Sequence, residues 1–143
     1  MGKKYKLTEE TIEVEGKTLY RIQALKDVNE YVEKRDLGGF VESEENLSQD
    51  GECWVFENAM VYEDARVYGD ARIRHNSKVY GNAKVYEDAW IGDNSKVYGN
   101  ARVYGKAWIL GNSVIKNIEL YENRGYENYH WSEETPLGKI LNG

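Results

Sequence analysis

A valine or an isoleucine occurs at every sixth residue through the middle of the chain, without interruption. The positions are 55, 61, 67, 73, 79, 85, 91, 97, 103, 109 and 115. Four residues after each of the first ten comes an alanine or a serine. A period of six fits neither the 3.6-residue turn of an α-helix nor a single hairpin, but it is typical of a solenoid whose short strands stack coil upon coil. The pattern therefore predicts an all-β solenoid over residues 51–116.

A second period, of 18 residues, predicts how many sides the solenoid has. Every third hexad, beginning at residue 55, differs from the others and carries asparagine at its fourth position. Three hexads per coil predict a three-sided prism of parallel strands, in which equivalent residues stack at a spacing of about 4.8 Å. We expect the asparagines to stack at one corner, because asparagine tolerates left-handed backbone angles. They are Asn58, Asn76, Asn94 and Asn112.

Residues 1–50 lack the repeat and predict a small β-rich leader that caps one end of the solenoid. Polar and apolar residues alternate over residues 11–14, a turn follows at Glu15-Gly16, and residues 18–24 predict a second strand. The leader and the solenoid together fit one domain with a cap, which is the limit for 143 residues.

Two features near the start of the solenoid have both a structural and a functional interpretation. Gly38-Gly39 predicts a tight turn rather than a phosphate-binding loop, because the lysine of such a loop is missing. Cys53 is the only cysteine, so the chain forms no internal disulfide and no cysteine-rich metal site. We expect Cys53 to be a small inward residue of the first coil rather than a reactive thiol.

The repeat ends after Ile115, and residues 117–143 form a different, aromatic segment. It contains the only proline, Pro136, and the aromatic residues Tyr121, Tyr126, Tyr129 and Trp131. An open last coil would leave strand edges and core exposed. We therefore expect this tail to cap its own solenoid or to reach a neighbouring chain.

Tyrosines follow directly after many inward aliphatic residues and must therefore point outward. They form one predicted ladder of Tyr62, Tyr80 and Tyr98 and another of Tyr68, Tyr86 and Tyr104, with Trp90 and Trp108 beside the second. An exposed aromatic strip of this size usually marks an interface. We expect these residues, with Tyr126, Tyr129 and Trp131 of the tail, to form a homo-oligomer interface. The alternative is that the ladders only stiffen their faces.

The third face carries Arg74, Gly92 and Leu110 where the others carry tyrosine. Next to these positions stand one histidine, one aspartate and a set of cations: His75, Asp93, Lys78, Lys96, Arg66, Lys84 and Arg102. Cations beside aromatic rings suit an anionic, planar ligand such as a nucleotide. The alternative is that the cations pair with acidic residues of neighbouring coils, namely Glu63, Asp64, Asp70, Glu87 and Asp88.

Charge and composition narrow the classes of partner. The formal net charge is −6, made up of −5 over residues 1–54, +2 over residues 55–116 and −3 over residues 117–143. An acidic chain is a poor binder of a phosphate backbone, so a nucleic-acid polymer is an unlikely partner. No apolar run is long enough for a membrane span or a signal peptide, so we expect a cytoplasmic protein.

The V-Y-G/E-N/D-A-K/R units of residues 53–116 resemble the left-handed β-helix hexapeptide-repeat family. This resemblance, and not the spacing, implies the left-handed winding and a trimer. The leader resembles that of small phage- and prophage-encoded repeat proteins, through YRIQAL from Tyr20, DLGGFV from Asp36 and ENLS from Glu45. For a phage protein, the location would be the host cytoplasm.

The hexapeptide-repeat family includes acyltransferases that use a histidine base and zinc enzymes that use three histidines. This chain has only His75 and His130, which excludes the zinc triad, and no cofactor or metal is expected. We therefore expect a non-catalytic, oligomeric binding protein that interferes with a host protein or sequesters a nucleotide signal. The alternative is an acyltransferase-like enzyme in which His75, oriented by Asp93, is the base.

Overall fold

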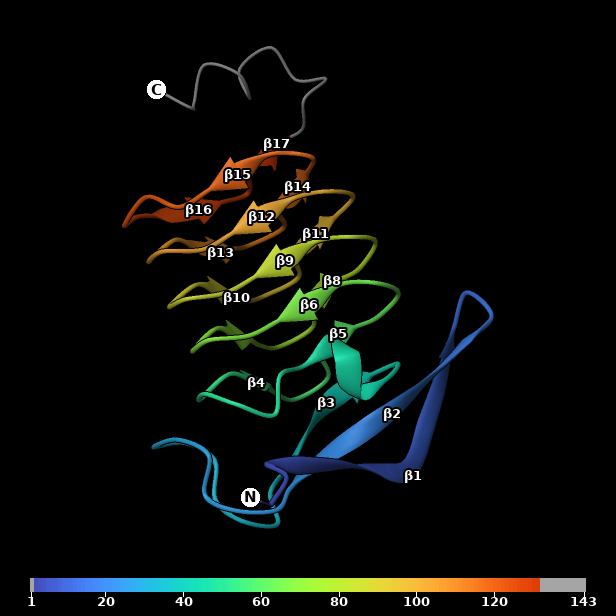
Figure 1. Ribbon diagram of the computed structural model, residues 1–143. Coiled ribbons are helices and arrows are strands. Elements are labelled where there is room, and N and C mark those ends of the chain that lie inside the picture. Colours follow the sequence, from blue (N-terminus) through green and yellow to red (C-terminus); the bar gives the residue numbers. More distant parts are fainter. Residues whose placement is uncertain (1, 132–143) are drawn as a thin grey trace.

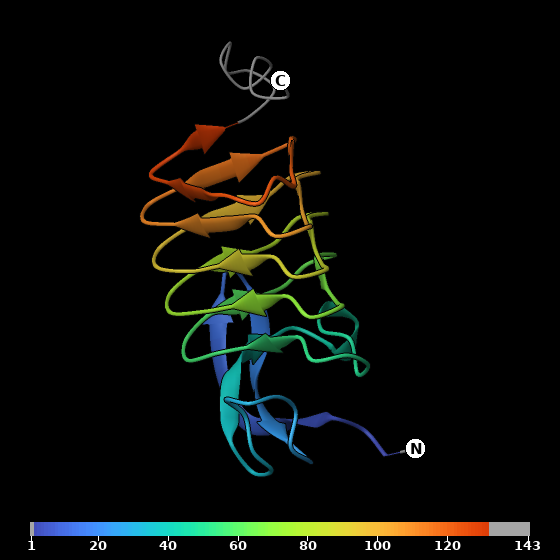
Figure 2. The ribbon, with the colours of Figure 1, turned by 90° about the vertical axis from the view of Figure 1, so that its left-hand side faces the viewer.

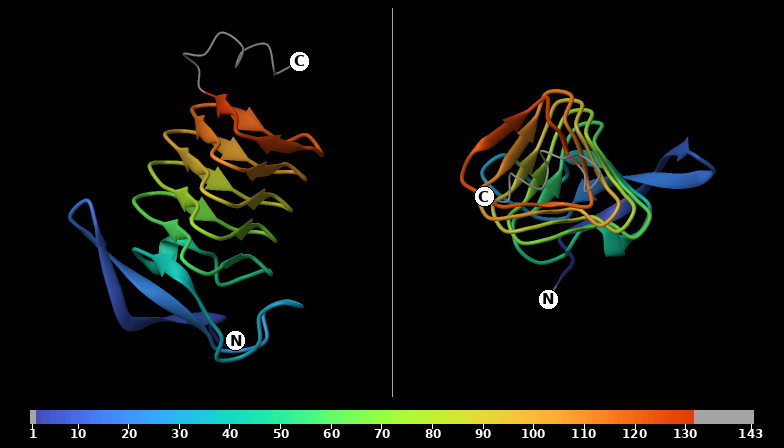
Figure 3. Two further views of the ribbon diagram at one scale, coloured as in Figure 1. Left: turned by 180° about the vertical axis from the view of Figure 1, so that it is seen from behind. Right: turned by 90° about the horizontal axis from the view of Figure 1, so that it is seen from above.

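The computed structural model describes residues 2–131, which form a parallel β-solenoid (Figure 1). Met1 and residues 132–143, with Pro136, lie outside the described residues. The regular elements of the described chain are β-strands, apart from one short 3₁₀ turn, η1 (Glu44–Asn46). Seen from above, the coils outline a triangle (Figure 3). The predicted all-β, three-sided solenoid is therefore confirmed.

Three sheets form the sides, and we name them by what they carry. The leader sheet contains β1 (Tyr5–Val14), β2 (Lys17–Ala24), β3 (Leu37–Val41), β5 (Met60–Val61), β8 (Lys78–Val79), β11 (Lys96–Tyr98), β14 (Val114–Lys116) and β17 (His130–Trp131). The tryptophan sheet contains β4 (Trp54–Val55), β7 (Arg72–Ile73), β10 (Trp90–Ile91), β13 (Trp108–Leu110) and β16 (Gly125–Glu127). The tyrosine sheet contains β6 (Arg66–Val67), β9 (Lys84–Val85), β12 (Arg102–Val103) and β15 (Glu119–Leu120).

The repeated aliphatic and small residues fill the interior of the prism. Each of the eleven valines and isoleucines and each of the ten alanines and serines has at most 1% of its surface exposed. Parallel pairing aligns equivalent residues of successive coils, such as Ile91 and Ile109, so the coils stack in register (Figure 2). Each fully buried aliphatic side chain stabilises the stack by about 1.5–3 kcal/mol.

The backbone turns each corner at the third residue of a hexad, not at the fourth. The third residues have φ between 57° and 70°, and they are Glu57, Glu63, Gly69, His75, Gly81, Glu87, Asp93, Gly99, Gly105, Gly111 and Asn117. The prediction that Asn58, Asn76, Asn94 and Asn112 supply the left-handed angle is therefore wrong. Corner side chains also bond to the next coil, since Glu63 Oε1 accepts a hydrogen bond from the Gly81 backbone N–H at 2.9 Å.

The leader adds three strands to one side of the solenoid. β1 and β2 form the predicted antiparallel hairpin, turning at Glu15 (φ 50°) and Gly16 (φ 80°), and β2 pairs with β3. β3 then pairs in parallel with β5 of the first coil. The hairpin projects beside the coils as an arm (Figures 1 and 3).

The prediction of a tight turn at Gly38-Gly39 is wrong, because both glycines are buried within β3. The physical reason for glycine here is a close approach of two backbone segments. A Cβ atom on Gly38 would lie 2.6 Å from the carbonyl oxygen of Val55. β3 therefore reaches the first coil only because these positions have no side chain.

The N-terminal end of the core is closed by Lys4 and its neighbours. Lys4 is 1% exposed, and its Nζ donates to the carbonyl oxygens of Asp50, Gly51 and Cys53 at 2.9–3.3 Å. Burial lowers the pKa of Lys4 from its usual range, although the neighbouring Cys53 opposes the effect. Cys53 itself is 0% exposed, which confirms its inward position.

The coils continue beyond the last hexad of the repeat. β15, β16 and β17 pair in parallel with β12, β13 and β14, so residues 119–131 add further strands to all three sheets. Leu120 aligns with Val103 and Tyr126 aligns with Ile109, and both are nearly buried. The described part of the aromatic tail is therefore solenoid, with tyrosine in place of an inward isoleucine.

Candidate functional site

The outer face of the tryptophan sheet carries two columns of residues, because each strand points two residues outward around one inward aliphatic residue. Going up the coils, the first column holds Trp54, Arg72, Trp90, Trp108 and Gly125. The second column holds Phe56, Arg74, Gly92, Leu110 and Glu127. This face thus combines aromatic rings, two guanidinium groups and two positions without a side chain.

A hollow of about 590 Å³ lies in the middle of this face. Its walls come from Arg74, Trp90, Trp108 and Leu110, and Gly92 lies between them. Gly92 stands where the other two faces carry tyrosine, so no ring from this position covers the hollow. Its volume falls within the range of about 300–1,000 Å³ that is usual for small-molecule sites.

Trp90 leans toward the preceding coil and covers both guanidinium groups. The Cζ atoms of Arg72 and Arg74 lie 5.6 Å and 5.8 Å from the centre of the Trp90 ring. On their other sides, Arg72 lies 5.1 Å from the ring of Tyr31, and Arg74 lies 5.1 Å from the ring of Phe56. The two arginines are therefore held between aromatic rings, where cation–π attraction orients them.

Trp108 leans the other way, toward the following coil. A Cβ atom on Gly125 would lie 2.6 Å from Trp108 Nε1, so the indole uses the space that this glycine leaves. Trp90 and Trp108 are register partners, yet across residues 2–131 neither indole stacks on the other. The indoles thus diverge above the hollow.

Among residues 2–131, no carboxylate forms an ion pair with Arg72 or Arg74. The Nε atoms of Arg72 and Arg74 are buried and have no hydrogen-bond partner, and neither side chain forms an ion pair with any described residue. Since their Nε atoms are buried, an incoming acceptor would meet the remaining guanidinium N–H groups. The face thus carries positive charge that no described carboxylate balances.

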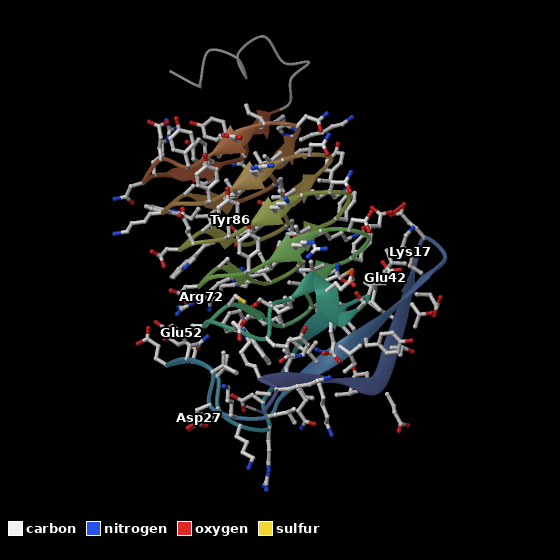
Figure 4. All side chains as sticks on the ribbon, viewed as in Figure 1. Lys17, Asp27, Glu42, Glu52, Arg72 and Tyr86 are labelled. Carbon is white, nitrogen blue, oxygen red and sulfur yellow. The ribbon has the colours of Figure 1, made fainter. Side chains whose placement is uncertain are left out.

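The predicted pairing of the cation rows with neighbouring acidic residues is not found among the described residues. Glu63 pairs instead with Lys17 of the hairpin at 3.2 Å, and Glu87 accepts the backbone N–H of Gly105 at 2.8 Å. The acidic side chains are thus used to bind the hairpin and the corners. Figure 4 places Lys17 and Glu42 on the hairpin side of the solenoid, away from Arg72.

The predicted ligand-binding residues do not form one group. Lys78 and Lys96 stack on the leader sheet, while Arg66, Lys84 and Arg102 stack on the tyrosine sheet. Grouping these five with Arg74 was wrong, because the sixth residue of a hexad starts the next side. Of the predicted set, Arg74 and His75 line the hollow, and Asp93 stands at the corner beside it.

The sequence interpretation missed several residues of the hollow. Trp90 and Trp108 were assigned to the interface, whereas they form its walls, and the rim also contains Asp88, Lys106 and Asn123. The signal for the tryptophans was available, since residues 90 and 108 directly precede the inward Ile91 and Ile109 and so share their strands.

His75 is part of a corner ladder. The ring Nδ1 of His75 accepts a hydrogen bond from the backbone N–H of Asp93 at 3.0 Å. The backbone N–H of His75 donates to Glu57 Oε1, also at 3.0 Å. Its Nε2 lies 3.8 Å from Glu57 Oε1, and Asp93 Oδ1 lies 3.5 Å from Nδ1. The Nδ1 atom of His75 is therefore already used within the corner ladder.

The tyrosine ladders form as predicted, with rings stacked one coil apart. On the tyrosine sheet, Tyr68, Tyr86 and Tyr104 have centroids 4.8 Å apart, and Tyr121 adds a fourth ring at 5.3 Å. Figure 4 shows Tyr86 on this face. On the leader sheet, Tyr62, Tyr80 and Tyr98 stack at 4.9–5.1 Å.

The prediction of an exposed interface position is wrong for two tyrosines, Tyr62 and Tyr126. Tyr62 is 1% exposed because it packs against Leu19 and Phe40 of the leader, and Tyr126 is 2% exposed because it lies in the core. Tyr129 is half-buried against the core, and Trp131 lies in β17. The tyrosine sheet is more open, with Tyr68 at 37% and Tyr121 at 50% exposure.

Two hydroxyl groups of the tyrosine ladder, those of Tyr68 and Tyr104, have a raised pKa. Burial first, and then the hydrogen bond of 3.1 Å donated to Glu119 Oε2, raise the pKa of Tyr104 to about 12. Burial first, with the neighbouring Tyr86, also raises the pKa of Tyr68. Neutral hydroxyl groups of Tyr68 and Tyr104 thus lie on the sheet that carries Arg66, Lys84 and Arg102.

Residues 96–111, which span β11 to β13, match a family model described as YdcK beta solenoid repeat. The chain is a β-solenoid repeat protein. No curated protein sequence matches it. Over the described residues, the structure contains no helix with the length and apolar character needed to cross a membrane.

Proposed function

We propose that this chain is a non-catalytic, oligomeric binding protein that holds an anionic ligand or partner on its tryptophan sheet. The observation that carries the proposal is Arg74 at the wall of the hollow, which lies beside the rings of Phe56 and Trp90 and forms no ion pair with any described residue. Arginine between aromatic rings is pre-oriented for bidentate contact with a phosphate or a carboxylate. An anion entering the hollow of about 590 Å³ meets Arg74 at its wall.

The tyrosine sheet is the part of the surface that we assign to self-association. Tyr68 and Tyr121 are well exposed, and the ladder between them presents a flat aromatic strip. Such strips on a protein surface commonly mark interfaces. A trimer is the form that the hexapeptide-repeat resemblance implies.

The leader resembles that of phage-type repeat proteins, and this resemblance underlies the part of the proposal that concerns a host cell. In that setting the protein acts in the host cytoplasm, where it interferes with a host protein or sequesters a nucleotide signal. The position of His75 favours binding over acyl transfer, because its Nδ1 is already an acceptor for the Asp93 backbone N–H.

Calorimetric titration tests the proposal with a panel of anions: inorganic phosphate, ribose 5-phosphate, AMP and an acidic peptide. We expect at least one of them to bind, and Arg74→Gln to weaken that binding about tenfold or more, because a charge-assisted contact is lost. The matched control is Arg66→Gln on the tyrosine sheet, which should leave the affinity unchanged. Equal weakening by both variants, or no binding by any anion, contradicts the proposal.

A further inference from the structure

We infer that Trp90 and Trp108 form a slot that takes one planar aromatic ring, and that the ligand is a purine nucleoside monophosphate. The base would enter between the indoles, and the phosphate would lie against Arg74. This inference rests on the proposed function, because it names the class of anion that the tryptophan sheet binds.

The first argument is the separation of the indoles. Tyrosines that are register partners close onto each other at centroid distances of 4.8–5.3 Å, leaving no room between rings. Trp90 and Trp108 are register partners in the same solenoid but do not stack. One lies over the arginines of the preceding coil and the other over Gly125. Both indoles line the hollow, and we place the third ring between them.

The second argument is the lack of a side chain at position 92. A Cβ atom on Gly92 would lie 3.3 Å from Leu110 Cδ2 and 3.4 Å from His75 Nδ1, so these two side chains lie close to the glycine. The φ of Gly92 is not in the left-handed region, so the backbone itself does not require glycine. The close approach of Leu110 and His75 accounts for glycine here, and the position adds no side chain to the hollow that it lines.

The third argument is the charge around the slot. Two tryptophans can also form a cage for a cation, but the preceding face of Trp90 already holds two guanidinium groups. Arg74 and Lys106 line the hollow against one carboxylate, Asp88. A ring that carries a single phosphate matches this small positive excess. Asp88 and Asn123 remain to bond the sugar hydroxyls or the base edge.

The test compares four probes by calorimetry and tryptophan fluorescence: AMP, adenosine, ribose 5-phosphate and inorganic phosphate. Base–aromatic stacking is sequence-tolerant and substantial, so AMP should bind roughly 10- to 100-fold more tightly than ribose 5-phosphate and should quench tryptophan emission. Adenosine should bind less tightly than AMP but still quench. Equal affinity for AMP and ribose 5-phosphate would overturn the slot while leaving the anion site intact. If none of the four probes binds, the inferred slot is overturned. If the acidic peptide does not bind either, the proposed function is overturned as well.

Two variants locate the ring. Gly92→Tyr restores the residue type that the other faces carry at this position, so the fold should persist while AMP binding is lost. Trp108→Leu should remove the difference between AMP and ribose 5-phosphate. Tyr86→Leu, which removes a ring from the tyrosine sheet, is the matched control and should preserve that difference. Full AMP affinity in Gly92→Tyr would contradict the inference.

Discussion

At the scale of single residues, the third position of each hexad decides how the chain turns its corners. Glutamate, aspartate, histidine and glycine alternate there with φ near 60°, although only glycine adopts this angle without cost. The longer side chains offset the strain, since each reaches the backbone N–H of the following coil, as Asp93 Oδ2 does to Gly111 N at 2.8 Å. Corner residues therefore serve both the turn and the stacking of coils.

This account predicts different costs for two glycine substitutions. Gly81→Ala should lower the free energy of unfolding by about 1–3 kcal/mol, because Gly81 has φ 68° and its Cβ would lie 2.8 Å from the Gly99 backbone nitrogen. Gly92→Ala is the matched control, with no left-handed angle and looser contacts, and should cost less than about 1 kcal/mol. Urea unfolding of both variants measures the difference, and equal costs would contradict the role assigned to the corner.

At the scale of elements, the leader buries the first ring of one tyrosine ladder, Tyr62, while the first ring of the other ladder, Tyr68, stays exposed. Leu19 and Phe40 cover Tyr62, and the Lys17–Glu63 ion pair joins the hairpin to the first coil. The sequence treats the two ladders alike, because both follow the same V-Y pattern. Their difference arises from the packing of a distant segment.

Matched tyrosine variants test this difference. Tyr62→Ala should lower the free energy of unfolding by roughly 3–4 kcal/mol, since it leaves a cavity beneath the hairpin. Tyr68→Ala removes the same atoms from a ring that is 37% exposed and should cost the separated chain about 1 kcal/mol or less. Thermal unfolding followed by circular dichroism gives both values. A similar loss in the two variants would mean that the hairpin does not cover Tyr62 in solution.

At the scale of the whole molecule, periodicity predicts nearly all of the solenoid and little of its site. The inward positions from Val55 to Ile115 follow directly from the six-residue repeat, because burial of one face imposes the period. The extra coil at Tyr126 was not predicted, since an aromatic residue replaces the aliphatic one there. The hollow was only partly predicted, because it depends on which way Trp90 and Trp108 lean, and that direction is set by Arg72, Arg74 and Gly125.

The central claim is that assembled chains bind an anion at the hollow of the tryptophan sheet. Native mass spectrometry with AMP present tests it most directly, because one spectrum reports both the number of chains and the number of ligands. The account predicts a particle whose mass is a multiple of 16.5 kDa, with one AMP per chain in the wild type and none in Gly92→Tyr. A bare 16.5 kDa monomer at saturating AMP would contradict it.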